Sequence, residues 1–287
     1  MSGTTCRIEA DGFAAVFVPE LAMVGCSLEH EGVELLAQNS GLEAYRERGS
    51  TFGIPLLHPW ANRLVRPLPA SGLVHHDAHG VPMHGVLPSV LPFTVTDQTA
   101  ASVRAEFDTH DHPAVLEVFP HPHLLVVAAT LTSAGLEIRT TIHAHGRRPL
   151  PVAFGYHPYL RLPSESRSAV EIEVPVPTRL VLDERQIPTG ERVRAVIAPG
   201  PLAQRTFDDG FADVVDGASF VVRGSGRTIA VTFLEGYSFA QVYAPSESEF
   251  ICFEPMTAPT NALTTGDSLT RVRPGDAYSA AFRISVG

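Results

Sequence analysis

Short apolar runs with strand periodicity, separated by turn residues, most constrain what this chain can fold into. Its 24 prolines and 23 glycines are spread along the whole sequence, and both residue types disfavour helices. Residues 101–107 show the strand pattern clearly, with Val103, Ala105 and Phe107 on one face and charged residues between them. The sequence therefore predicts many short β-strands and little helix.

Two hairpins are predicted from apolar runs joined by short glycine-containing turns. Residues 124–131 and 136–143 flank Ser133-Ala134-Gly135, and residues 220–223 and 228–234 flank Gly224-Ser225-Gly226. Further strands are expected at 14–18, 23–28, 33–36, 93–97, 170–174, 238–243 and 277–284. Such a pattern favours an all-β fold, an antiparallel sandwich. No composition break marks a linker, so one domain over residues 1–287 is expected.

Two long stretches, 38–59 and 175–210, do not fit ordinary hairpin loops. Loops of this length in a compact domain usually carry function or a short helix. We therefore expect one or the other in each stretch.

Composition excludes several classes of protein. The formal net charge is −10 and no basic patch stands out, which argues against a nucleic-acid or anionic-membrane partner. All 21 basic residues are arginine, so Schiff-base chemistry on lysine is excluded. The cysteines Cys6, Cys26 and Cys252 form no C-x-x-C pair, which indicates free thiols in a reducing compartment. With no signal peptide or membrane-span pattern, a soluble cytoplasmic protein is expected.

Two titratable residues stand beside prolines at the ends of apolar runs. His157 lies in V-A-F-G-Y-H-P-Y-L-R-L-P, residues 152–163, and Glu254 follows the run 250–253 in F-E-P-M-T. A residue before proline is pushed toward extended backbone, so each is predicted at or near a strand end. A lone histidine of this kind is more often a buried structural residue. Two such sites together suggest an acid–base pair.

Other chemistries fit the sequence less well. No G-x-S-x-G elbow is present, and a glycosidase pair of Glu254 with Asp208 or Asp209 would leave His157 without a role. Neither histidine cluster has a firm ligand spacing with a carboxylate partner, so no metal and no cofactor are predicted. The clusters are His75, His76, His79 and His84, and His110, His112, His121 and His123.

Two further motifs are candidates for ligand binding. Asn62-Arg63 follows the apolar segment around the tryptophan in P-W-A-N-R-L. A half-buried guanidinium needs acceptors, which a polyhydroxyl ligand or an internal salt bridge would supply equally well. His84 precedes Gly85, where the backbone can approach a ligand closely. An ordinary loop histidine is the simpler interpretation there.

Together these motifs resemble the aldose 1-epimerase (galactose mutarotase) family. G-I-P-L-L-H-P-W-A-N-R-L is similar to its G-x-P-x-x-x-P-x-x-N-R segment, M-H-G to its downstream H-G, and F-E-P-M-T-A-P-T-N-A-L to its E-P-x-T-x-x-P-N-A segment. D-D-G-F at 208–211 resembles its D-x-x-F element, and R-P-G-D at 273–276 its turn before the last strand. G-Y-H-P-Y-L-R-L resembles a variant of H-x-Y-F-N-L, in the G-x-H-P-Y form of a broader bacterial subgroup. The matches follow the family's order from about Gly53 to Asp276.

The resemblance implies a galactose mutarotase-like supersandwich fold and an isomerase that interconverts the α and β anomers of a hexose or related aldose. His157 would be the general acid and Glu254 the general base, with ordinary pKa values of about 6.5 and 4.3. Arg63, His84 and Asp208, with Asn62, would hold the sugar. The expected partner is a small sugar bound by a monomer or homodimer, and no metal or cofactor is implied.

Two rival functions fit the same fold. A hexose-6-phosphate 1-epimerase would need cations at the phosphate, for which Arg46, Arg48 and Arg66 are candidates. A carbohydrate-binding protein without turnover would need neither an acid nor a base.

Overall fold

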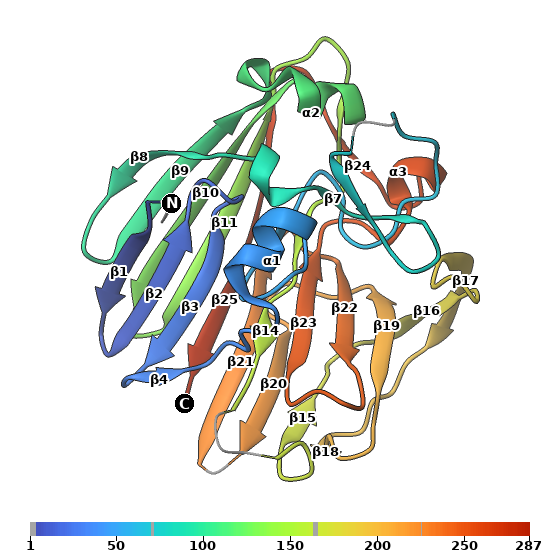
Figure 1. Ribbon diagram of the computed structural model, residues 1–287. Coiled ribbons are helices and arrows are strands. Elements are labelled where there is room, and N and C mark those ends of the chain that lie inside the picture. The colour runs from blue at the N-terminus through green and yellow to red at the C-terminus, as the bar shows by residue number, and fades with distance from the viewer. Residues whose placement is uncertain (1–3, 70–71, 163–165, 225) are drawn as a thin grey trace.

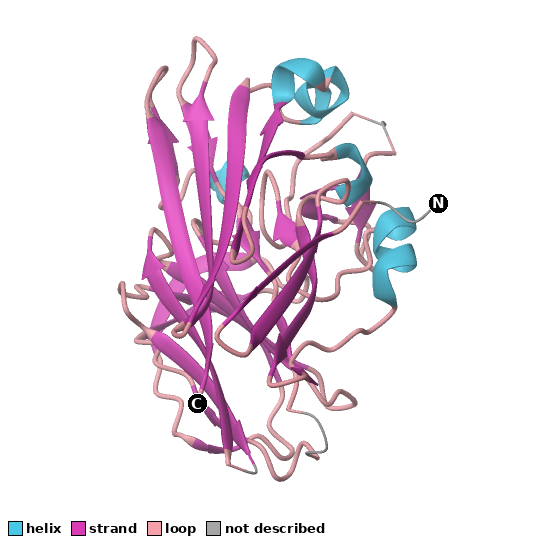
Figure 2. Cartoon of the chain, turned by 90° about the vertical axis from the view of Figure 1, so that its left-hand side faces the viewer, coloured by secondary structure: helices cyan, strands magenta, loops and turns pink. Residues whose placement is uncertain are grey.

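The computed structural model describes residues 4–69, 72–162, 166–224 and 226–287. Antiparallel strands carry the bulk of the molecule, as Figure 2 shows. The predicted all-β class is therefore confirmed. Pro163 and Ser225, which end the His157 stretch and centre the second hairpin turn, lie outside the described residues.

The largest sheet has nine strands and contains both predicted hairpins. The first hairpin pairs Ala129 with Ile138, and the second pairs Val222 with Ile229. In spatial order its strands are β18 (Gly200–Pro201), β15 (Glu171–Glu173), β20 (Ser219–Gly224), β21 (Arg227–Glu235), β25 (Ala277–Val286), β11 (Gly135–Ala144), β10 (His123–Thr132), β9 (Ser102–Asp108) and β8 (Thr94–Gln98).

The second sheet positions three of the predicted site residues, His157, Asp208 and Glu254. In order its strands are β17 (Pro188–Arg194), β16 (Thr178–Leu182), β19 (Phe207–Ala212), β22 (Phe239–Ala244), β23 (Ile251–Met256), β13 (Gly155–Tyr156) and β5 (Leu56–Leu57), with β14 (Tyr159–Leu160) also pairing β23. The stretch 175–210 forms β16, β17, β18 and the start of β19 and contains no helix, and its residue Asp208 belongs to the site described below.

Smaller sheets complete the fold. One contains β1 (Cys6–Ala10), β2 (Phe13–Val18), β3 (Val24–His30) and β4 (Val33–Glu34), and it lies over β9 to β11 (Figure 1). The other two are the pairs β6 (Val74–His76) with β7 (Pro82–Val86) and β12 (Leu150–Val152) with β24 (Thr270–Val272).

The two large sheets pack face to face through aromatic side chains. The ring centroids of Phe220 on β20 and Phe253 on β23 lie 5.5 Å apart. Those of Tyr156 on β13 and Phe282 on β25 lie 5.1 Å apart. The Tyr156 hydroxyl is buried and is 2.7 Å from Oγ1 of Thr140 on β11. Facing layers that interdigitate in this way form a β-sandwich core.

Helices are short and lie in the connections. They are α1 (Gly41–Arg48), α2 (Pro113–Val118), α3 (Ala262–Thr265) and the 3₁₀ turns η1 (Pro88–Val90) and η2 (Thr109–Asp111). The stretch 38–59 contains α1, as expected, and α1 ends at Gly49, whose φ is +69°. Among the described residues, no helix has the length and apolar character needed to cross a membrane.

Candidate active site

His157 and Glu254 face each other across an interruption in the second sheet. Gly155 on β13 pairs with Met256, and Tyr159 on β14 pairs with Cys252. Both pairings share one antiparallel register, which places His157 opposite Glu254 between them. Their side chains meet there, with His157 Nε2 3.1 Å from Glu254 Oε1.

His157 lies between two short strands, as its sequence predicted. Glu254 does not lie at a strand end, because β23 continues through Pro255 to Met256. Proline is tolerated in a strand where its missing N–H is not needed. On the side facing His157, β23 has strand partners only at residues 251, 252 and 256 among the described residues. Pro255 therefore breaks no ladder bond on that side.

The neighbouring strands add polar side chains to the same face of the sheet. Gln241 on β22 pairs with Glu254, and Tyr243 on β22 pairs with Asp208 on β19. The Gln241 amide Nε2 donates a 2.6 Å hydrogen bond to Asp208 Oδ1. Asp209, next along β19, lies on the opposite face because side chains alternate, and it binds Arg179 at 2.8 Å. The structure therefore brings Asp208, not Asp209, to the site.

The segment before β6 supplies Asn62 and Arg63 to the opposite wall, and β7 supplies His84. Both Asn62 and His84 have positive φ values, 57° and 63°. Two hydrogen bonds join these residues. His84 N donates to Asn62 O at 2.9 Å, and Asn62 N donates to His84 Nδ1 at 3.3 Å. Since Nδ1 accepts, the ring proton of neutral His84 belongs on Nε2. Left-handed backbone at non-glycine residues is costly and is often found at functional sites.

Gly85 serves a different purpose from the one its sequence suggested. A Cβ at Gly85 would lie 2.0 Å from the carbonyl oxygen of His58, and the Gly85 φ is +79°. Its close approach is therefore to the protein backbone, not to a ligand. This contact fixes the position of His84 relative to the 58–60 segment.

Arg63 forms the internal salt bridge and also reaches the cavity. Its Nε donates to Asp77 Oδ2 at 2.7 Å, and the two side chains are 11% and 7% exposed. Its Nη1 donates to Asn62 Oδ1 at 3.2 Å. Burial alone would raise the pKa of Asp77. Hydrogen bonds from the main chain of Val81 and His79 and from Arg63 outweigh it and lower that pKa. Asp77 therefore compensates the charge of Arg63.

These side chains surround a polar cavity of about 260 Å³. Its size is just below the ~300–1,000 Å³ common for small-molecule sites, which suits a ligand no larger than a monosaccharide. The segment after α1 contributes Thr51, whose Oγ1 is 2.6 Å from the Tyr159 hydroxyl. The lining residues are Gly49, Ser50, Thr51, Asn62, Arg63, His75, Met83, His84, His157, Tyr159, Asp208, Gln241, Tyr243 and Glu254.

Burial moves the two facing titratable groups away from their ordinary behaviour. The side chains of His157 and Glu254 are 6% and 2% exposed. Burial lowers the pKa of His157 to about 3. Burial, and then the charge of Asp208, raises the pKa of Glu254 well above its ordinary value, while Arg63 opposes this. The ordinary values assumed from sequence are therefore wrong, because both groups are almost excluded from water.

Several residues that line or support the cavity were not singled out from sequence. Gln241 and Thr51 carry no motif that marks them. Asp77 lies in H-H-D-A-H, which is typical of a solvated loop, yet its carboxylate is buried on Arg63. Tyr159 and Tyr243 both line the cavity, and both rings lie against His157.

Comparison with known proteins agrees with this geometry. The family profile described as Aldose 1-epimerase matches residues 24–285. The chain belongs to the aldose 1-epimerase family. That match spans every residue of the cavity.

Solved structures share the fold of this aldose 1-epimerase family member. The Slr1438 protein of Synechocystis is 22% identical, with a TM-score of 0.80 over 100% of this chain and 96% of that one. A galactose mutarotase-like protein from Clostridium acetobutylicum is 18% identical, with a TM-score of 0.82 over 98% and 94%. The GalM/aldose epimerase homologue from C. elegans is 16% identical, with a TM-score of 0.77 over 100% and 99%.

Proposed function

We propose that this protein is a mutarotase that interconverts the α and β anomers of a free hexose or close relative in the cavity described above. One observation carries the proposal: two buried titratable side chains meet at 3.1 Å on the floor of a polar cavity. Glu254 Oε2 and His157 Nδ1 are buried and have no hydrogen-bond partner among the described residues. Unpaired buried polar atoms are costly, and a sugar's hydroxyl groups would supply the missing partners.

The remaining polar residues suit a polyhydroxyl ligand. Asp208 offers carboxylate oxygens as acceptors, and His84 offers Nε2–H as a donor. Arg63 uses Nε and Nη1 within the protein, so Nη2 has no protein partner among the described residues. Tyr159 and Tyr243 add aromatic surface beside these groups. Donors, acceptors and aromatic faces together match the surface of a sugar ring.

Ring opening requires two proton transfers. The bond between C1 and the ring oxygen breaks, and its electron pair goes to the ring oxygen, which takes a proton from His157. Glu254 takes the proton of the anomeric hydroxyl as the C1 carbonyl forms. Rotation about the C1–C2 bond then exposes the other carbonyl face. The reverse transfers close the ring as the other anomer and restore both residues, so the cycle is complete without a cofactor.

The buried setting makes both groups more reactive. A protonated His157 with a lowered pKa is a stronger acid than free histidine, and an ionised Glu254 with a raised pKa is a stronger base. Ring opening converts this ion pair into a neutral imidazole and a neutral carboxyl, which burial favours. In the resting form, one proton lies between Glu254 Oε1 and His157 Nε2, which are 3.1 Å apart, and it is bound to Glu254. Transfer of that proton to His157 Nε2 produces the reactive form.

The charges around the cavity favour an unphosphorylated sugar over a sugar phosphate. Among the described lining residues, Arg63 is the one arginine, and Asp77 already compensates its charge. Arg46 and Arg48 do not line the cavity. Arg66 donates to the carbonyl of Val118. A phosphate here would face Asp208 with no free cation to balance it.

The same geometry argues against a protein that only binds sugar. Burying a carboxyl beside an imidazole costs stability, and binding alone would not require it. A pure binder would be better served by neutral amide groups at both positions. We therefore infer that the pair is retained for proton transfer.

Anomer exchange measured by proton NMR saturation transfer tests this proposal. The panel contains free aldoses and their 6-phosphates, with wild-type protein, Glu254→Gln, and the exposed control Glu247→Gln. Exchange is expected on at least one free aldose, with a loss of about 10²–10⁴-fold in Glu254→Gln and none in the control. Exchange on the 6-phosphates alone would show that the substrate is a sugar phosphate and not a free sugar. Sugar binding without exchange would establish a binding protein.

A further inference from the structure

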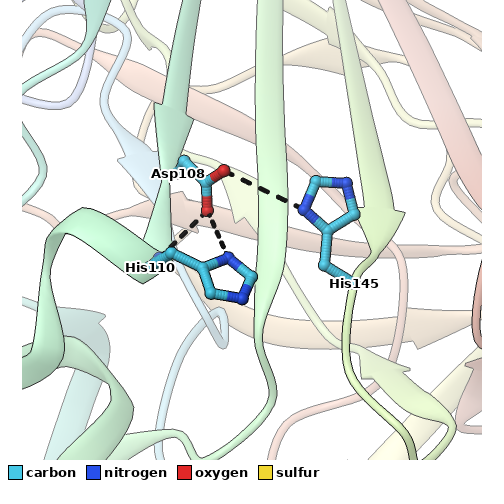
Figure 3. Close-up of side chains that lie close together, drawn as sticks. All are labelled: Asp108, His110 and His145. Atoms are coloured by element: carbon cyan, nitrogen blue, oxygen red, sulfur yellow. Dashed lines mark hydrogen bonds and ion pairs between the residues drawn. The ribbon is translucent and has the colours of Figure 1, made fainter.

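A second polar cluster lies at the end of the nine-stranded sheet, among residues that do not line the sugar cavity. It contains Asp108, the last residue of β9, His110 in η2, and His145 just after β11. Figure 3 shows both imidazole rings directed at the Asp108 carboxylate. The mutarotase chemistry uses none of these side chains.

The strand register explains why these three residues meet. On β10, Leu124 pairs with Asp108 on one side and with His143 on the other. His145 is two residues beyond His143, and its main-chain N–H donates to the carbonyl of Pro122 at 3.0 Å. Residues two apart in extended chain share a face of the sheet. His145 therefore reaches Asp108 across β10, which the sequence alone does not reveal.

The distances suit a single bound metal ion. His110 Nδ1 lies 2.9 Å from Asp108 Oδ1, and His145 Nδ1 lies 3.9 Å from Asp108 Oδ2. One ligand atom from each residue can be chosen so that all lie within 4.8 Å of one another. A tetrahedral ion with bonds of about 2.1 Å spaces its ligand atoms about 3.4 Å apart. The two measured distances lie on either side of that value but reach different carboxylate oxygens, so side-chain shifts of up to about an ångström would seat an ion.

The cluster can also make those shifts and admit an ion. The side chains of Asp108, His110 and His145 are 34%, 55% and 36% exposed, so they can rotate in contact with water. Burial alone would raise the pKa of Asp108. Hydrogen bonds from the main chain and the ring of His110 outweigh it and lower that pKa. The carboxylate is therefore ionised at neutral pH.

We propose that Asp108, His110 and His145 form a surface site for one divalent transition-metal ion, Zn²⁺ first. Two imidazoles and one carboxylate are a ligand set that Zn²⁺ and its neighbours Ni²⁺ and Cu²⁺ accept. Water completes the coordination on the exposed side. Mg²⁺ and Ca²⁺ prefer oxygen ligands, so they should not compete. Of the three ligands, His110 alone belongs to a histidine cluster described from sequence, and the fold adds Asp108 from β9 and His145 after β11.

An ion at this site would join three segments that are separate in sequence: the end of β9, η2, and the chain after β11. Since the ion binds the folded protein, it stabilises that state by mass action. At a Zn²⁺ concentration 100 times the Kd, the melting temperature should rise by about 4 °C. Mg²⁺ at the same concentration should leave it unchanged.

Isothermal titration calorimetry with Zn²⁺ and Ni²⁺ in a non-chelating buffer tests the site. Wild-type protein should bind one ion, and His145→Gln and His110→Gln should each weaken binding at least 10-fold. The matched control is His76→Gln, an exposed histidine on β6, and it should bind like wild type. Thermal melts of the same variants report whether each is folded.

Three outcomes would overturn the proposal. The first is no saturable binding of either ion at millimolar concentration, which would leave the cluster as two histidines hydrogen-bonded to one carboxylate. The second is unchanged affinity in the double variant His110→Gln, His145→Gln, which would place the ion elsewhere. The third is equal loss in His76→Gln, which would indicate non-specific binding to surface histidines.

Discussion

Lowering the pH from 6.5 to 5 should destabilise this protein steeply, because the fold keeps four histidines in their neutral form, three of them buried and His84 partly buried. Burial lowers the pKa of His157 to about 3 and that of His123 to about 4. It lowers the pKa values of His58 and His84 well below the ordinary value. In the unfolded chain each imidazole binds a proton below about pH 6.5. The unfolded state therefore binds more protons, and acid favours it.

The magnitude follows from the number of protons taken up on unfolding. Each neutral buried histidine contributes about 1.4 kcal/mol per pH unit below its unfolded pKa. Glu254 acts in the opposite direction, because its raised pKa lets the folded state keep a proton that the unfolded state releases. Four protons gained against one lost leave about three, or about 4 kcal/mol per pH unit near pH 5.5. A typical domain has only ~5–15 kcal/mol in total, so most of the stability should be lost by pH 5.

Urea denaturation at closely spaced pH values between 7.5 and 5 measures this slope directly. His84→Gln should reduce the slope by about one proton, or about 1.4 kcal/mol per pH unit, whatever its effect on stability at pH 7.5. A free energy of unfolding that stays flat between pH 6.5 and 5 would refute the reasoning.

Three further predictions concern the cavity. At pH 6.5, kcat/KM for anomer exchange should still exceed half of its maximum, because its loss at alkaline pH follows the raised pKa of Glu254 and not the ordinary pKa of a free histidine. A fall to half of the maximum near pH 6.5 would contradict this. Asp208→Asn should raise KM about 10-fold while Asp209→Asn, on the opposite face, leaves it unchanged, and equal effects would contradict the assignment. The Tyr159 hydroxyl is 3.5 Å from His157 Nε2, so Tyr159→Phe should lower kcat about 10-fold and leave KM unchanged. A wild-type kcat in this variant would show that Tyr159 does not position His157.

The long strands could be predicted from sequence because one of their faces is buried. Residues 102–108 alternate between buried and accessible positions as the apolar pattern indicated. The hairpin β10–β11 follows from its glycine turn. Here the local pattern and the tertiary environment agree, so periodicity was sufficient.

The strands around the site could not be predicted in this way. β5, β13 and β14 have two residues each, too few to show any period. β13 and β14 are positioned by pairing with β23, about a hundred residues away in the chain, and β5 is positioned by pairing with β13. That His157 and Glu254 meet was inferred from two prolines and a family resemblance, since nothing local in either segment specifies the partner.

The sequence did not show which of Asp208 and Asp209 faces the cavity, although neighbouring residues of a strand point to opposite faces. That choice depends on Gln241 and Tyr243 of β22. Similarly, Asp77 has the composition of a solvated loop and becomes buried only through Arg63. In both cases the deciding contact comes from a segment distant in sequence.

The interruption between β13 and β14 has a consequence for how this site can vary among relatives. Both flanking strands hold β23 in one register, so the number of residues between them is fixed even where their identity is not. Side chains change face with each residue of a strand. Deleting or inserting one residue at 157 or 158 would turn the imidazole away from Glu254, although the core packing of Tyr156 could persist. Substitutions in this segment should therefore be tolerated during divergence far more readily than changes in its length.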